Sequence, residues 1–144
     1  MKQFKYSMES VLDYRKEIEQ VRKQEFGELK KQYVVQKAVL DDLEKKLKNA
    51  LYIQLDKTPV KLADLKSLQK YTIYLQDKIE KQEELVMEIE TRMDQEREKL
   101  LAAQKDRKIV EKHKEKSLGK HNYKVYRTEQ KANDEFALYS HLRK

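Results

Sequence analysis

The chain has 144 residues, of which 41% are charged, with a formal net charge of +7, two glycines, one proline and no cysteine. So many charges with so few turn-forming residues exclude a compact globule with a large core, and they predict long helices with solvated faces. The lack of cysteine excludes disulfides, thiol catalysis and thiolate metal sites. No apolar run is long enough to span a bilayer and the first residues lack a signal-peptide core, so we expect a cytoplasmic protein.

The first predicted helix runs from about Ser7 to Leu55. Apolar residues spaced three and four apart predict one inward-facing seam of a coiled coil, since a 3.5-residue period keeps them on one side. In the early part of the helix we expect the seam to be held by Val11, Tyr14, Ile18 and Val21, with a stutter before Phe26. After the stutter the predicted inward positions are Arg22, Phe26, Leu29, Tyr33, Gln36, Leu40, Leu43, Leu47 and Ala50.

A turn is predicted at residues 56–59, where Thr58 can cap the next helix and Pro59 suits its first position. The second predicted helix runs from about 59 to 142. Its seam positions are Leu65, Leu68, Thr72, Leu75, Ile79, Gln82, Val86, Ile89, Met93, Glu96, Leu100, Ala103, Arg107 and Val110.

The two seams predict an all-α fold: a long two-helix antiparallel coiled-coil hairpin, forming a single elongated domain over residues 1–144. With the turn centred next to Pro59, Leu40 would face Leu75. A register slipped by one heptad satisfies the seams equally well but moves the turn away from the proline. In the chosen register everything after about Lys112 is a C-terminal helical overhang without a partner in the chain.

Six of the predicted inward positions are polar, and polar residues at such positions lower stability while fixing register. Register control is one interpretation of them, and a rod that flexes or exchanges partners is the other. The six residues are Arg22, Gln36, Thr72, Gln82, Glu96 and Arg107.

No catalytic motif is present. His113, His121 and His141 are too widely spaced for a metal triad, and no Gly-rich phosphate loop occurs. We therefore expect neither an enzyme nor a cofactor or metal site. The turn end carries a surplus of apolar residues that either cap the coiled coil or form a docking patch: Leu51, Tyr52, Ile53, Leu55, Val60, Leu62 and Ala63.

Several short motifs resemble those of a known family over essentially the full length. The stretch from Phe4 to Arg15 resembles the start of FliJ, the small soluble component of the bacterial flagellar type III export apparatus. Glu129-Gln130-Lys131 before Asp134-Glu135-Phe136-Ala137 is similar to its tail, and Arg107-Lys108 followed by Glu111 also fits. The resemblance implies an antiparallel coiled coil similar to the central stalk of rotary ATPases.

The resemblance also implies partners: the ring of the export ATPase FliI, the export-gate protein FlhA and flagellar substrate chaperones. We expect a monomer that binds no nucleic acid and that reaches the cytoplasmic face of the cell membrane only through the export apparatus. For the gate we expect a surface beside the seam made by Lys46, Tyr71, Tyr74, Leu75 and Lys78. For the ATPase ring we expect the overhang to use Tyr123, Tyr126, Glu129, Asp134 and Glu135.

Two other function classes stay open. One is a generic coiled-coil scaffold or homodimer, which solution mass would distinguish from a monomer. The other is a basic binder of nucleic acid or of a membrane surface through residues 112–131, whose binding would fall steeply with salt.

Overall fold

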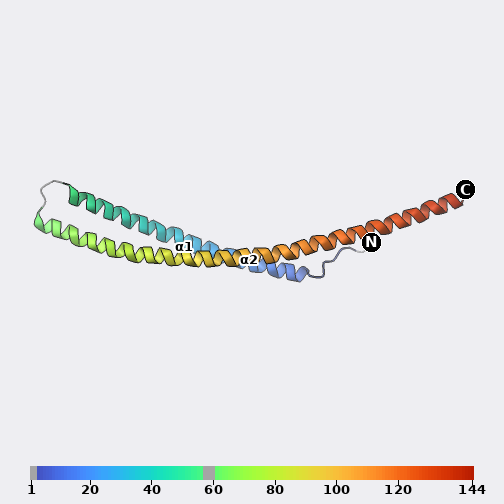
Figure 1. Cartoon of the computed structure of the whole chain (residues 1–144), viewed down its shortest axis with the longest axis horizontal. Coiled ribbons are helices and arrows are strands. Elements are labelled where there is room, and N and C mark those ends of the chain that lie inside the picture. Colours follow the sequence, from blue (N-terminus) through green and yellow to red (C-terminus); the bar gives the residue numbers. More distant parts are fainter. Residues whose placement is uncertain (1–2, 57–60) are drawn as a thin grey trace. The chain divides into compact units, whose positions relative to one another are not determined.

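The structure is a computed structural model that describes residues 3–56 and 61–144. It contains two long α-helices packed antiparallel, α1 (Glu9–Leu55) and α2 (Leu62–Leu142) (Figure 1). The predicted all-α helical hairpin is confirmed. The predicted cap and first-turn residues, Thr58 and Pro59, lie outside the described residues. In the described ranges no helix has a stretch both long and apolar enough to cross a membrane.

The chain divides into two compact units, which are described separately. Unit 1 holds residues 1–21 and 101–144, and unit 2 holds residues 22–100. In unit 2 the predicted seams are confirmed, because every predicted inward position is buried or half-buried except Leu65. The centre of its core is formed by Leu40, Ile79 and Val86, with Tyr33, Leu43 and Leu47 packed around them.

The register in unit 2 differs from the prediction. Leu40, predicted to lie against Leu75, clusters instead with Ile79 and Val86, which are four and eleven residues farther along α2. The midpoint between Ile79 and Val86 lies about seven residues beyond Leu75 along α2. The hairpin therefore adopts the register that is slipped by one heptad. The apolar seams could not distinguish the two registers, because a heptad repeat looks the same after seven residues.

Polar pairing at inward positions provides the physical reason for the register. Gln82 Nε2 donates to Gln36 Oε1 at 2.8 Å and to the Gln36 carbonyl at 2.9 Å. Arg22 Nη1 lies 3.8 Å from Glu96 Oε2. In both registers Gln36 and Gln82 lie in neighbouring layers of the seam, whereas Arg107 and Glu19 come within reach of each other only in the observed register. Because a polar group that loses water needs another partner, the register with paired polar residues is favoured. These contacts support the register-control interpretation.

In unit 1 the predicted early seam is wrong. Val11, Tyr14 and Val21 are exposed and Ile18 is only half-buried, whereas Leu12 is buried and so is Glu19, at 5% exposure. Arg15 is half-buried beside them, so the inward positions of α1 keep the three-and-four alternation and the predicted stutter is wrong as well. The prediction followed apolar residues alone and missed the charges that are buried through pairing.

Those buried charges are joined across the two helices. Glu19 accepts a hydrogen bond from Arg107 Nε, and Arg107 Nη1 also donates to Glu111 at 2.7 Å. Arg15 Nη1 lies 3.3 Å from Asp106 Oδ2. The hydrogen bonds to Glu111 and then to Glu19 raise the pKa of Arg107, so its charge is retained while it is half-buried.

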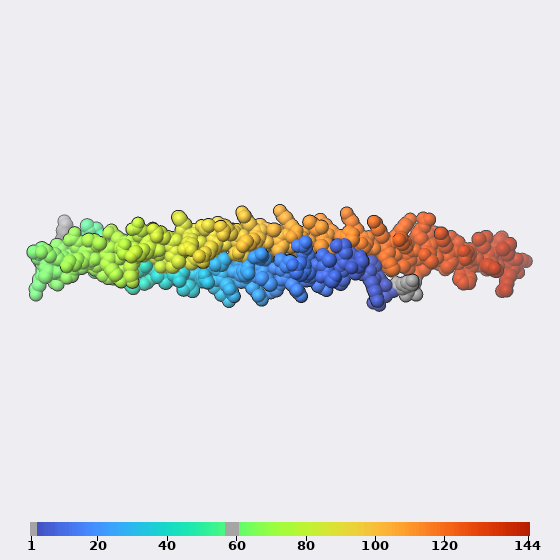
Figure 2. All heavy atoms as spheres, turned by 90° about the horizontal axis from the view of Figure 1, so that it is seen from below, coloured from blue at the N-terminus to red at the C-terminus, as the bar shows by residue number. Residues whose placement is uncertain are grey.

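The overhang is shorter than predicted, because the segment before α1 packs along α2 within unit 1 (Figure 2). The Tyr6 hydroxyl is 2.7 Å from His113 Nδ1, and the ring centroids of Phe4 and His121 are 5.4 Å apart. Lys114 Nζ lies 2.8 Å from Glu9 Oε2. The prediction that α2 lacks a partner from Lys112 onward is therefore wrong up to His121. From residue 126 to residue 144 every side chain is exposed.

Candidate partner-binding sites

The first candidate site is a tyrosine-bearing face of α2 in unit 2. Tyr71, Tyr74 and Lys78 follow one another at helical spacing, so they share one side of the helix beside the seam. Both tyrosines are about half exposed, and Lys78 Nζ lies 5.0 Å from the centroid of the Tyr74 ring. This cation–π contact holds a positive charge over an aromatic ring at the surface.

Lys46 of α1 belongs to the same face. Lys46 Nζ forms an ion pair with Asp42 Oδ2 at 3.1 Å. The hydrogen bond to Asp42 and the charge of Asp42 raise the pKa of Lys46, and Tyr71 and Tyr74 add smaller contributions in the same direction. The electrostatic influence of the two phenols places them near the lysine. The structure thus brings Lys46, Tyr71, Tyr74 and Lys78 together, whereas Leu75 is only 2% exposed and lies in the core beneath them.

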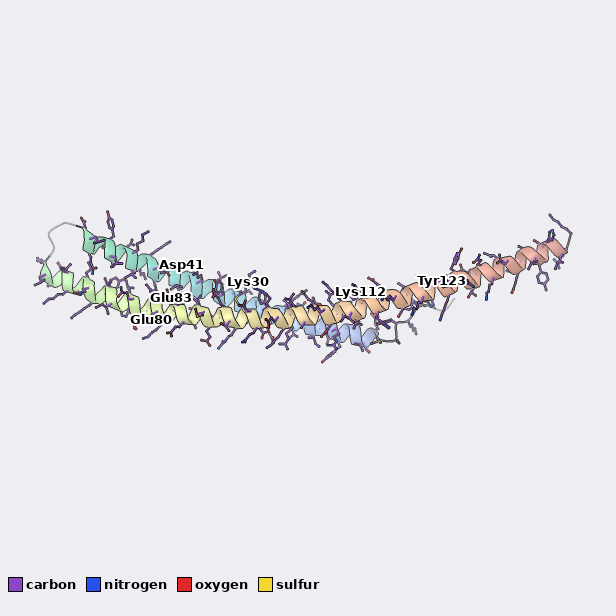
Figure 3. All side chains as sticks on the ribbon, viewed as in Figure 1. Lys30, Asp41, Glu80, Glu83, Lys112 and Tyr123 are labelled. Atoms are coloured by element: carbon purple, nitrogen blue, oxygen red, sulfur yellow. The ribbon has the colours of Figure 1, made fainter. Side chains whose placement is uncertain are left out.

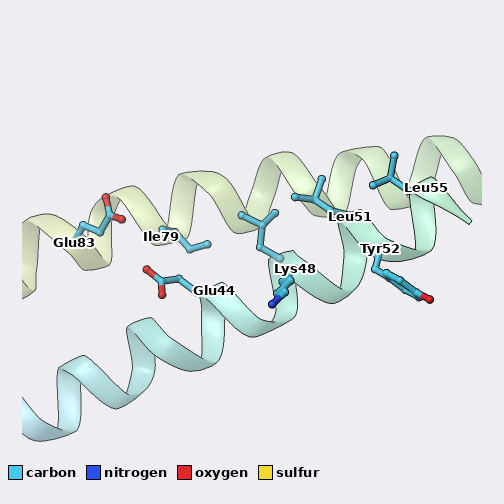
Figure 4. A pocket seen from close by; sticks show the side chains of 8 residues that line it. Glu44, Lys48, Leu51, Tyr52, Leu55, Ile79 and Glu83 are labelled. Atoms are coloured by element: carbon cyan, nitrogen blue, oxygen red, sulfur yellow. The ribbon is translucent and has the colours of Figure 1, made fainter.

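The turn end of unit 2 holds a pocket that sequence reasoning did not define (Figure 4). Its volume is about 520 Å³, and its lining is mostly apolar with charged residues at the edge. The lining residues are Glu44, Leu47, Lys48, Leu51, Tyr52, Leu55, Ile79 and Glu83. Tyr52 is 76% exposed, and Leu51, Ile53, Leu55 and Leu62 are exposed as well. Val60 lies outside the described residues, and the rest of the apolar surplus at the turn is surface, as the docking-patch interpretation expects.

Only part of this pocket could have been found from the sequence. The cluster of Leu51, Tyr52 and Leu55 next to a turn was a visible signal. Glu44 and Glu83 were not, because both are common charged residues on a coiled-coil surface. Whether Glu44 and Glu83 line the same pocket depends on the register of the two helices, which the apolar pattern left ambiguous.

The second candidate site is the exposed end of α2 in unit 1. Tyr123 and Tyr126 are exposed, and Arg127 Nη1 donates to the Tyr123 hydroxyl at 3.3 Å with its guanidinium carbon 5.8 Å from the ring centroid. Glu129, Asp134 and Glu135 are also exposed.

The alternative role of these acids, ordinary pairing with Arg127 and Lys131, is not seen. In the part of the chain that the structure describes, no ion pair joins Glu129, Asp134 or Glu135 to a basic side chain. Arg127 contacts Tyr123 one turn earlier instead. The three carboxylates are therefore available to an external partner.

Comparison with known proteins gives one match. Residues 4–144 match the family described as Flagellar FliJ protein, which covers nearly the whole chain. A search of curated proteins and a search of solved structures each gave no match.

Proposed function

This chain belongs to the flagellar FliJ family and is a component of the flagellar export apparatus, and we propose that it acts there as a non-catalytic stalk. In this proposal the exposed end of α2 enters the ring of the export ATPase FliI. The tyrosine-bearing face of unit 2 binds the export-gate protein FlhA. The protein also contacts substrate chaperones, works as a monomeric single domain in the cytoplasm, and reaches the cell membrane through the apparatus.

One observation carries the stalk proposal. From residue 126 to Leu142, α2 continues as a helix in which every side chain is exposed. Isolated helices of this length are marginal in water, since most helical stability in proteins comes from packing of an apolar face. Phe136 and Tyr139 share one side of this segment and Leu138 lies on another, so its exposed apolar side chains point in more than one direction. A ring that encloses the helix would cover it from all sides.

The gate proposal is supported by the chemistry of the tyrosine-bearing face. Tyrosine supplies a large, rigid contact area with a polar end and is enriched among the residues that dominate binding energy. Here Tyr71 and Tyr74 are flanked by Lys46 and Lys78, so the face is both aromatic and basic. A partner surface with carboxylates around an aromatic-accepting depression would be complementary to it.

The test uses a chain that ends at Val125, because this truncation retains the contacts of Phe4, Tyr6 and Glu9 with α2. We expect the shortened protein to unfold with unchanged stability and to lose helical signal only in proportion to the residues removed. In pull-downs it should no longer bind the export ATPase but should still bind the gate protein.

The matched control is the Tyr71→Ala, Tyr74→Ala double variant of the full-length chain. It should bind the ATPase normally and the gate protein weakly. Full ATPase binding by the truncated chain would refute insertion of the helix end. Unchanged gate affinity of the tyrosine variant would show that the two tyrosines only cover the coiled coil.

A further inference from the structure

A row of lysines runs along α2 in unit 1, on residues that neither the seam nor the proposed partners use. We propose that this face binds the surface of an anionic phospholipid bilayer directly. The row, here called the lysine ladder, consists of Lys108, Lys112, Lys116, Lys120 and Lys124. This inference goes beyond the proposed function, which brings the protein to the membrane only through the export apparatus.

The net charge of the protein is concentrated around the ladder. Residues 101–144 contain twelve Lys or Arg and six Asp or Glu, whereas residues 1–21 contain four of each. Unit 2 is nearly balanced, with seventeen basic and sixteen acidic residues. Unit 1 therefore carries +6 of the formal net charge of +7. An asymmetry of this kind creates a local positive potential that attracts anionic surfaces.

Helix geometry puts Lys108, Lys112 and Lys116 on the half of α2 opposite its packed side, and it turns Lys120 and Lys124 progressively to the flank of the packed side. Residues four apart are rotated by about 40° and rise about 6 Å, so the five lysines cover roughly 160° over about 24 Å. The inward side is occupied by Val110, Lys114 and Ser117, which are buried or half-buried. The ladder residues are all exposed, and Figure 3 labels Lys112 on α2.

The ladder has no internal compensation. In the described residues none of its five ammonium groups takes part in an ion pair, in contrast to the neighbouring Arg107 and Lys114, which pair with α1. Like charges spaced by four residues on a helix repel one another and destabilise it. A folded helix that retains five such charges in a row gains stability when an external anion neutralises them.

The composition of the face favours a bilayer over nucleic acid. Lysine is a hydrated point charge on a flexible stem, which suits mobile headgroups on a plane, whereas arginine is the residue enriched where phosphates are bound in fixed geometry. Between the lysines lie Ile109, 66% exposed, and Tyr123, 59% exposed. An aliphatic and an aromatic side chain inside a basic face can enter the headgroup region, as in helices that lie on membranes.

The proposal is tested by co-sedimentation of the full-length protein with vesicles at about 0.15 M salt. Wild-type protein should bind vesicles of phosphatidylcholine mixed with phosphatidylglycerol, and should not bind vesicles of phosphatidylcholine alone. Replacing Lys112, Lys116, Lys120 and Lys124 by Gln should weaken binding at least about tenfold, because each lysine near an anionic surface contributes separately. Replacing the same four residues by Arg should preserve it.

The matched control removes the same charge elsewhere. Lys30, Lys31, Lys45 and Lys66 are exposed lysines of unit 2, and their replacement by Gln gives the same net charge as the ladder variant. Its affinity for the mixed vesicles should stay within about threefold of wild type. The proposal is overturned if the wild-type protein does not bind the anionic vesicles, or if the unit 2 control variant loses as much binding as the ladder variant. Tighter binding to duplex DNA than to vesicles at equal salt would also overturn it. No ATPase is present, so the outcome is independent of the stalk proposal.

Discussion

The paired glutamines inside unit 2 provide the sharpest test of how polar residues at inward positions depend on each other. Gln82 Nε2 donates two hydrogen bonds to Gln36, at 2.8 and 2.9 Å, and both side chains are half-buried. A neutral hydrogen bond contributes about 0.5–1.5 kcal/mol net, and an acceptor left without a donor costs more. Gln82→Leu alone should therefore lower the free energy of unfolding by about 1–2 kcal/mol.

The double variant Gln36→Leu, Gln82→Leu should behave differently. No polar group is then left unpaired, and two apolar side chains are buried, each worth about 1.5–3 kcal/mol when burial is complete. We expect the double variant to be at least as stable as wild type, with a coupling between the two positions well above about 0.5 kcal/mol. Urea unfolding followed by circular dichroism measures all three variants.

The register can be measured by crosslinking two introduced cysteines, because the chain has no native cysteine that would compete. Leu47 and Ile79 line one pocket, so cysteines at these positions should react together with a short thiol crosslinker in wild type. In the alternative register Leu47 faces Leu68, and the helices are displaced by about 10 Å. A Glu19→Leu, Arg107→Leu double variant should form both the 47–79 and the 47–68 crosslink, because the Glu19–Arg107 pair can form only in the observed register. Additive stability changes of the glutamine variants would refute the coupling of Gln36 with Gln82. A single, unchanged crosslink in the Glu19→Leu, Arg107→Leu variant would refute the claim that this ion pair selects the register.

Three further predictions concern stability. Leu75→Ala, at a position only 2% exposed, should lower the free energy of unfolding by about 2–4 kcal/mol, measured by urea unfolding. Gly27→Ala and Gly119→Ala should each raise helix stability by up to about 1 kcal/mol, because both glycines are helical with open space for a Cβ; a melting temperature that falls would contradict this. The hydrogen bond from Lys99 and its charge lower the pKa of Glu96, with smaller contributions from Glu25 and Arg22. The stabilising contribution of Glu96 is therefore present above pH 4.5 and is lost as the pH falls through the lower folded-state pKa. Glu96→Gln should flatten the pH dependence of the melting temperature below pH 4.5, and an unchanged slope would contradict this.

The inward positions of unit 2 could be predicted because apolar side chains at a 3.5-residue period lie on one side of a helix and can be buried together only if that side faces a partner. Leu40, Leu75 and Ile89 follow that rule and are buried. The same regularity made the register unpredictable, since the apolar contribution changes little after a shift of seven residues. The choice between registers depends on a few polar atoms, and their pairing is visible only when both helices are placed.

The start of α1 was mispredicted for a related reason. From residue type alone, Glu19 is expected to face solvent and Val21 is expected to lie in the core. Their observed burial is the reverse, because Arg107 compensates the Glu19 carboxylate across the helices. The contacts of Phe4 and Tyr6 with α2 lie outside any helical period, so periodicity could not anticipate them. The identity of each external partner likewise depends on surfaces that the chain alone does not contain.

The pocket at the turn end shows why the register matters beyond stability. α1 supplies Leu51, Tyr52 and Leu55 to its walls, and α2 supplies Ile79 and Glu83. A slip of one heptad would carry the α2 residues about 10 Å away from the α1 residues and dismantle the pocket without changing any residue that lines it. Surfaces built from both helices are thus defined by the polar pairs in the seam. In the Glu19→Leu, Arg107→Leu double variant, the methyl NMR signals of Leu51 and Ile79 should therefore split into two sets, one for each register, whereas a single unshifted set would show that the pocket does not depend on this ion pair.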